Sequence, residues 1–145
     1  MTTLTKLLFL GGTVGKNEWR KPFTDRLIAA GVSPDAIFNP VVADWNETAQ
    51  ANEERAKKEA THMLFYIANP YLPGSTLSAY SMVEATMALY DKPETTVVVF
   101  DSKDITEHSL KAFKQTEKVL RKRFPNAMIF GTVDEAAEQL AAQLK

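Results

Sequence analysis

Glu84 is the residue of this 145-residue chain with the clearest potential for chemistry. It ends a stretch rich in proline, glycine and serine, residues 69–84, that follows an apolar run. A carboxylate near a helix N-terminus is stabilised in its ionised form, which suits a nucleophile better than a general acid. The spacing of Ser81 and Glu84 is also that of a capping box, in which the two residues do no more than start a helix. Both interpretations of Glu84 are consistent with the residues alone.

A glycine-rich segment, residues 11–16, follows the first apolar run and leads to Trp19 and Arg20. It matches neither a Walker loop nor a dinucleotide-binding fingerprint, because Leu10 stands where each motif requires its first glycine. Such a loop still lets a ligand approach the backbone, and it leads to an aromatic face with a cation beside it. Alternatively, Trp19 caps the core and Arg20 is solvated.

Asp44 and Trp45 follow the second apolar run, after the pair Asn39-Pro40. A carboxylate and an indole at the end of a strand can hold a sugar hydroxyl and stack on a base. The alternative is structural, with Asp44 starting a turn or capping the charged segment at 49–60 and Trp45 packing over the sheet edge.

Short apolar runs alternate with segments of helical spacing along the whole chain. We expect strands at residues 4–10, 36–42, 63–68, 95–100 and 127–130, and helices at 22–30, 49–60, 81–90, 105–124 and 133–144. This alternation predicts one flavodoxin-like three-layer α/β domain over residues 1–145, with a five-stranded parallel sheet of order 2-1-3-4-5 and helices on both faces. Ligands of such sheets bind beyond the carboxyl ends of the strands, near the switch between strands one and three. The segments 11–20, 43–48, 69–80 and 101–104 should therefore meet there.

The composition limits the classes of molecule that the protein is expected to bind. With 17 basic and 18 acidic side chains, a net charge of −1 gives no electrostatic case for a nucleic-acid polymer or an anionic membrane. The chain has no cysteine, and its two histidines lie far apart, so we expect neither a disulfide nor a metal site. No stretch reaches about 18 apolar residues. We expect a soluble cytoplasmic protein with a small-molecule ligand.

The order and spacing of these motifs over roughly residues 7–101 resemble the nucleoside 2-deoxyribosyltransferase family and its nucleotide N-hydrolase relatives. The resemblance rests on three features. A glycine-rich loop is followed by Trp19-Arg20, and Asn39-Pro40 is followed by Asp44-Trp45. The third feature is the loop that leads to Ser78 and Glu84 before Lys92-Pro93. It implies that Glu84 attacks the anomeric carbon of a (deoxy)ribonucleoside and that Ser78 assists. It also implies a homo-oligomer that needs no cofactor or metal.

An enzyme of this kind would cleave or transfer an N-glycosidic bond through Glu84, with Asp44 holding sugar hydroxyls or protonating the leaving base. Trp19 or Trp45 would stack on the base. The substrate-binding candidates are Gly12, Thr13, Trp19, Arg20, Trp45, Asn69, Ser75 and Ser78, of which Arg20, Ser75 and Ser78 could bind a 5′-phosphate.

The alternative is a module that binds a nucleotide without turning it over. Val83-Glu84-Ala85 stands where the family usually has Gly-x-Glu-hydrophobic-Gly, which favours this second hypothesis. The sequence leaves open the base, ribose or deoxyribose, nucleoside or 5′-phosphate, and water or a second base as acceptor.

Overall fold

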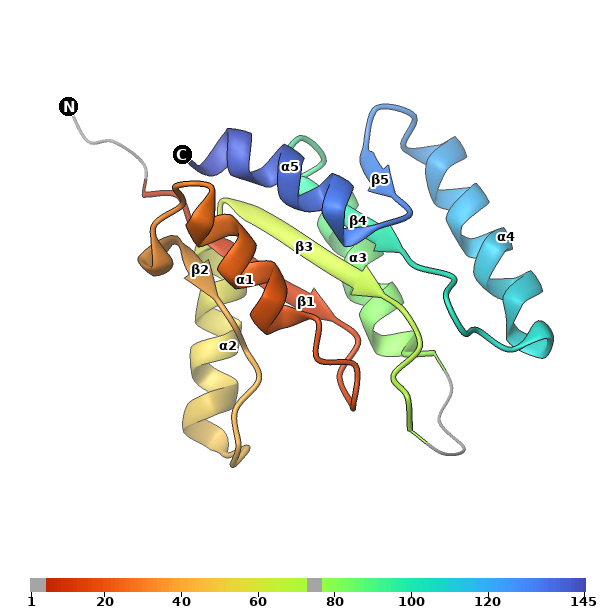
Figure 1. The fold of residues 1–145 in the computed structure, drawn as a ribbon, viewed down its shortest axis with the longest axis horizontal. Helices are drawn as coiled ribbons and strands as arrows, with labels where there is room; N and C mark the ends of the chain where they lie inside the picture. The colour runs from red at the N-terminus through yellow and green to blue at the C-terminus, as the bar shows by residue number, and fades with distance from the viewer. Residues whose placement is uncertain (1–4, 73–76) are drawn as a thin grey trace.

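A computed structural model describes residues 5–72 and 77–145 of the chain (Figure 1). Strands and helices alternate, as the sequence predicts. The strands are β1 (Leu8–Gly12), β2 (Ile37–Phe38), β3 (His62–Ile67), β4 (Thr96–Phe100) and β5 (Met128–Phe130). The helices are α1 (Arg20–Ala29), α2 (Glu47–Glu59), α3 (Ala79–Asp91), α4 (Glu107–Arg123) and α5 (Val133–Leu144), with a short 3-10 turn, η1 (Pro34–Ala36).

The five strands form one parallel sheet in the order β2-β1-β3-β4-β5, which confirms the predicted topology. β3 lies at the centre, where Leu64 pairs with Leu10 of β1 on one side and with Val97 of β4 on the other. After β2 the chain crosses to the opposite side of β1. This reversal is the switch point beside which α/β sheets bind ligands.

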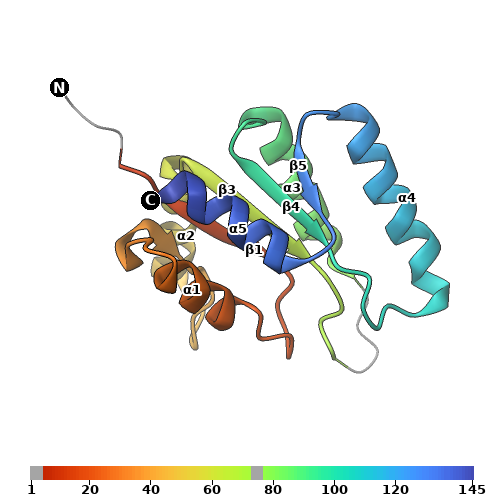
Figure 2. The ribbon, with the colours of Figure 1, turned by 45° about the horizontal axis from the view of Figure 1, so that its top comes forward.

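Helices cover both faces of the sheet (Figures 1 and 2). α1 and α5 pack on the face that receives Leu8, Leu10 and Leu64. α2, α3 and α4 pack on the other face, which receives Phe9 and Phe65. Every residue of β1, β3 and β4 is buried, as expected of central parallel strands.

β1 differs from the prediction because Gly11 and Gly12 continue the strand and do not end it. Gly12 pairs with Tyr66 of β3 and has φ of +111°, a conformation that favours glycine. A Cβ atom at Gly12 would collide with the backbone of Tyr66. The missing side chain lets the two strands stay in contact up to Thr13, whose N–H donates to the Tyr66 carbonyl at 2.7 Å.

β2 is much shorter than the predicted strand at 36–42. Pro40 has no N–H to give to a sheet, and the Asn39 side chain accepts a hydrogen bond from Val41 N at 3.0 Å and turns the chain. Val41 and Val42 are exposed at this edge. The residues after Phe38 thus form a loop at the carboxyl end of the sheet.

α2 begins two residues before the predicted start because Asn46 caps it, accepting a hydrogen bond from Ala49 N at 2.8 Å. The side chains on its inner side are small, since Ala56 and Ala60, the residue that follows the helix, are the buried ones. Among the helices of the described ranges, none has the length and apolar character to cross a membrane.

Gly12→Ala should lower the free energy of unfolding by about 2–5 kcal/mol, because it adds backbone strain and a steric clash between β1 and β3. Gly131→Ala is the matched control, since nothing beyond the neighbouring residues of the chain lies within 4 Å of the added methyl group, and it should stay within about 0.5 kcal/mol of wild type. Urea unfolding followed by circular dichroism measures both. Equal urea midpoints for the two variants would contradict the close approach of the strands.

Candidate functional site

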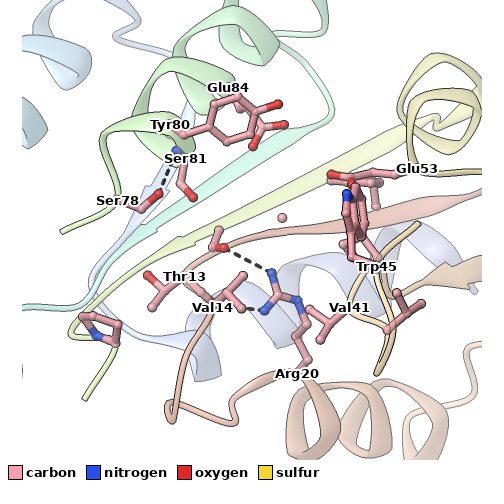
Figure 3. A pocket seen from close by; sticks show the side chains of 16 residues that line it. Thr13, Val14, Arg20, Val41, Trp45, Glu53, Ser78, Tyr80, Ser81 and Glu84 are labelled. Atoms are coloured by element: carbon pink, nitrogen blue, oxygen red, sulfur yellow. Dashed lines mark hydrogen bonds between the residues drawn. The ribbon is translucent and has the colours of Figure 1, made fainter. Parts of the chain in front are cut away.

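The loops after β1, β2 and β3 meet at the carboxyl edge of the sheet, because β1 pairs with both of its neighbours there. A pocket of about 430 Å³ lies among them (Figure 3). Its lining residues are Phe9, Gly11, Gly12, Thr13, Val14, Arg20, Pro40, Val41, Val42, Trp45, Glu53, Pro70, Ser78, Tyr80, Ser81 and Glu84.

Two groups of side chains face each other across the pocket. Tyr80, Ser81 and Glu84 from α3 lie on one side in Figure 3, and Trp45 and Glu53 lie on the other. The Trp45 and Tyr80 side chains are 56% and 67% exposed, so both rings are accessible to a ligand. The site combines flat aromatic surfaces with carboxylates.

Arg20 is buried below this space, so the alternative that it is solvated is wrong. Its guanidinium donates hydrogen bonds to the carbonyls of Leu10, Gly12 and Thr13 at 3.2, 3.2 and 2.9 Å. Burial lowers the pKa of Arg20 to about 10, against the opposing influence of the Glu53 charge, so the group stays cationic at neutral pH. Arg20 fixes the end of β1 and brings positive charge to the pocket.

Trp19 is not at the pocket, contrary to the expectation that it stacks on a base. It is 5% exposed, its ring centroid lies 4.8 Å from that of Tyr66, and it also packs against Phe23. Its Nε1–H donates to the Thr13 carbonyl at 3.0 Å. The indole is therefore part of the core, as the alternative stated, and it supports the loop after β1 from inside.

Thr13 and Asn69 hold the loops together. The Thr13 hydroxyl donates to the Ala68 carbonyl at 3.1 Å and accepts from Ala68 N at 2.9 Å. Asn69, expected to bind substrate, instead accepts from Tyr71 N at 2.7 Å and donates to the Asp104 carbonyl at 2.6 Å. Asn69 does not line the pocket, because its amide is directed to the loop after β4.

Ser78 caps α3 and lines the pocket. Its hydroxyl accepts a hydrogen bond from Ser81 N at 3.1 Å, so the helix begins at Ala79, two residues before the predicted start. The proposed capping box of Ser81 and Glu84 is therefore wrong, since Ser81 is the capped residue and Glu84 lies in the second turn. The carboxylate of Glu84 is not used at the helix start.

Glu84 pairs with Lys57 of α2. Lys57 Nζ lies 2.7 Å from Glu84 Oε2 and 3.6 Å from Glu53 Oε1. The side chains of Glu84 and Lys57 are only 15% and 26% exposed. Burial acts to lower the pKa of Lys57, but the hydrogen bond and charge of Glu84, with Glu53 and Tyr80, outweigh it and raise that pKa. Lys57 thus links the two carboxylates of the pocket.

Asp44, expected to be catalytic, is exposed and does not line the pocket. After the turn at Pro40 the chain directs Val41, Val42 and Trp45 to the pocket and leaves Asp44 in solvent. Asp44 does not cap α2 either, because Asn46 does. Ser75 lies outside the described residues. Of the other candidates, the pocket lining contains Gly12, Thr13, Arg20, Trp45, Ser78 and Glu84.

Sequence reasoning missed Glu53, Lys57 and Tyr80. α2 looks like a solvated helix because most of its residues are charged. The available signal was the i, i+4 spacing of Glu53 and Lys57, which places both on one side of the helix. Tyr80 belongs to the first turn of α3, beside the cap.

The pocket can bind a flat ring against Trp45 or Tyr80 and present the Glu84 carboxylate to an atom attached to that ring. Arg20 and the Ser78 hydroxyl are suited to an oxygen-rich group. Within residues 5–72 and 77–145, no three His, Asp or Glu side chains are grouped in a way that could hold a metal ion.

The model of a protein family described as "Nucleoside 2-deoxyribosyltransferase like" matches residues 5–103, more than half of the chain. The matched region contains β1 to β4 and all the residues that line the pocket. A comparison with curated protein sequences found no significant match.

Ser78→Ala should lower the free energy of unfolding by about 1 kcal/mol, because the Ser81 N–H loses its capping acceptor. Ser78→Asp should retain most of the stability, since a carboxylate also caps a helix and interacts favourably with its dipole. Chemical denaturation of both variants provides the measurement. A Ser78→Ala variant as stable as wild type would show that α3 begins elsewhere and would reopen the structural role of Glu84.

Proposed function

The chain belongs to the nucleoside 2-deoxyribosyltransferase-like family, and from this premise we propose that it breaks the N-glycosidic bond of a (deoxy)ribonucleoside or nucleotide. The supporting observation is that the Glu84 carboxylate lines the pocket and takes no part in capping α3. A pocket of about 430 Å³ suits one such small molecule. We place this activity in the cytoplasm, where nucleotides are made and degraded.

The reaction would follow the logic of retaining glycosidases. A Glu84 carboxylate oxygen attacks C1′, the bond from C1′ to the base nitrogen breaks, and the base leaves with that electron pair and takes up a proton. The resulting ester joins Glu84 to the sugar. Water or the nitrogen of a second base then attacks C1′, loses a proton, and releases Glu84 as a carboxylate. No redox partner is required.

The substrate would lie between the two sides of the pocket. We assign base stacking to Trp45, with Tyr80 opposite, because Trp19 is in the core. Arg20 and Ser78 are the candidates for contact with a 5′-hydroxyl or 5′-phosphate. Glu53 is better placed than Asp44 to accept hydrogen bonds from sugar hydroxyls, because it lines the pocket.

A second candidate function is a nucleotide-binding module. Its support is the ion pair between Glu84 and Lys57, because a carboxylate held by an ammonium group is a weaker nucleophile than a free one. The same pocket residues would then recognise the ligand without cleaving it.

Glu84→Gln should reduce base release at least about 10³-fold, since the amide keeps the shape of the side chain but is not a nucleophile. Free base is measured by chromatography over a panel of nucleosides and 5′-monophosphates, and binding is measured by calorimetry. Glu59→Gln, an exposed change on α2, is the control for loss of one negative charge. Circular dichroism checks the fold of each variant.

The outcomes separate the two functions. Base release by wild type and its loss in Glu84→Gln support the enzyme. Binding without base release supports the module. Undiminished release in a folded Glu84→Gln variant contradicts the assignment of Glu84 as nucleophile.

We also propose that the protein is a homo-oligomer that associates through α3. Tyr80, Val83, Met87 and Tyr90 form an exposed apolar stripe along this helix, at helical spacing and each more than half exposed. Contiguous apolar patches of this kind mark interfaces. Glu54, Lys58, Asp91 and Lys92 line the groove beside the stripe, so a second copy related by a two-fold axis can pair acids with bases.

Val83→Lys should convert the oligomer into a monomer of 16.2 kDa, because it places a charge in the centre of the apolar stripe. Val119→Lys on α4 is the matched control, since Val119 is 63% exposed and is not part of the stripe. Sedimentation equilibrium gives the mass of each variant. A monomeric wild type, or an oligomer that survives Val83→Lys, would contradict association through α3.

A further inference from the structure

We propose that Lys57 is a positioning residue for the nucleophile, an inference that rests on the proposed function. Lys57 holds one oxygen of the Glu84 carboxylate and leaves the other oxygen directed at C1′. No motif in the sequence singles out Lys57, which lies within a helix of mostly charged residues. Its ammonium group lies between α2 and α3, in contact with Glu84.

The contact between Lys57 and Glu84 is short and partly shielded from water. Nζ lies 2.7 Å from Oε2, the length of a charge-assisted hydrogen bond. Because the two side chains are 26% and 15% exposed, water and salt screen this pair less than a surface pair. It can therefore restrict the orientation of the carboxylate.

Lys57 approaches Glu84 from the side away from the substrate. A groove of about 540 Å³ between α2 and α3 is lined by Lys57, Tyr80 and Glu84, among others. Tyr80 and Glu84 also line the pocket at the strand ends, but Lys57 does not. The ammonium group thus contacts the carboxylate from the groove and leaves the pocket open for a ligand.

Other groups hold Lys57 in place. Its Nζ lies 5.9 Å from the centre of the Phe9 ring and 5.8 Å from that of Tyr80, within the range of cation–π contacts. Lys92, at the end of α3, donates a hydrogen bond to the Lys57 carbonyl at 3.1 Å and another to Ala60. This link ties α3 to the last turn of α2 and maintains the separation of the two helices.

Glu53 gives Lys57 a second negative partner, 3.6 Å away. When Glu84 forms an ester with the sugar it loses its charge, and Glu53 remains to balance the ammonium group. The titratable groups facing Lys57 are Glu53 on α2 and Glu84 and Tyr80 on α3. The groove also contains the charged groups of Glu54, Lys58, Asp91 and Lys92. Since its neighbours raise the pKa of Lys57, this side chain is cationic throughout the neutral range.

Lys57→Met should lower kcat for base release by about 100-fold, the effect of misplacing a reacting group by about 1 Å, while KM changes little. Lys57→Arg should restore most of kcat, because it replaces the positive charge and the hydrogen bond. Lys118→Met on α4 is the control, since Lys118 is exposed and lines neither the pocket nor the groove, and it should retain wild-type kcat.

An amine-acylating reagent followed by mass spectrometry tests the ion pair without using activity. Lys57 should react slowly in wild type, because its pKa is raised and it is held by Glu84, and severalfold faster in Glu84→Gln. Lys118, which is exposed on α4, should react at the same rate in both proteins.

The results identify which proposal fails. An active wild type that depends on Glu84, together with full kcat in folded Lys57→Met, overturns the positioning role alone. Equal acylation of Lys57 in wild type and Glu84→Gln overturns it as well. Absence of base release from wild type overturns the proposed function. The role of Lys57 in that reaction is then overturned as well.

Discussion

The close contact of β1 with β3 at Gly12 is the constraint on which the site depends. Only a residue without a side chain fits against the Tyr66 backbone, and it lets the two strands remain paired to their carboxyl ends. Thr13 can then hydrogen-bond both the Tyr66 carbonyl and Ala68. Arg20 completes this arrangement by binding three carbonyls at the end of β1. The floor of the pocket is thus rigid because backbone groups define it.

The charged part of the pocket wall has a different origin, since Glu53 and Glu84 belong to helices that the parallel crossovers place on one face of the sheet. α2 and α3 both pack on the face that receives Phe9 and Phe65. This packing brings Lys57 next to Glu84, residues 27 positions apart in the chain. The electrostatic part of the site therefore depends on the core: a change in packing under α2 or α3 would move the ammonium group relative to the carboxylate.

The sequence was sufficient to predict the strand order and the edge of the sheet at which the pocket lies. Repeated alternation of strands and helices allows few topologies, and the carboxyl ends of the strands then converge. It could not show that Trp19 is inside and Trp45 outside, because both follow a strand and both are large aromatics. The short β2 depends on Pro40 and the Asn39 turn, whose effects compete with the β propensity of Val41 and Val42. Such competition is resolved only by tertiary contacts.

The role open to Glu84 depends on which residue caps α3, and the two possible caps, Ser78 and Ser81, are three residues apart. A cap at Ser81 would use the glutamate to satisfy backbone N–H groups, whereas a cap at Ser78 leaves the carboxylate in the second turn, at the pocket. The ion pair with Lys57 has two opposing effects on Glu84, because it orients the carboxylate as a nucleophile and also weakens its nucleophilicity. Which effect dominates depends on whether the ammonium group can transfer its interaction to Glu53 as the Glu84 charge is consumed. At 3.6 Å, Glu53 is close enough to accept that interaction with a small movement of the lysine side chain.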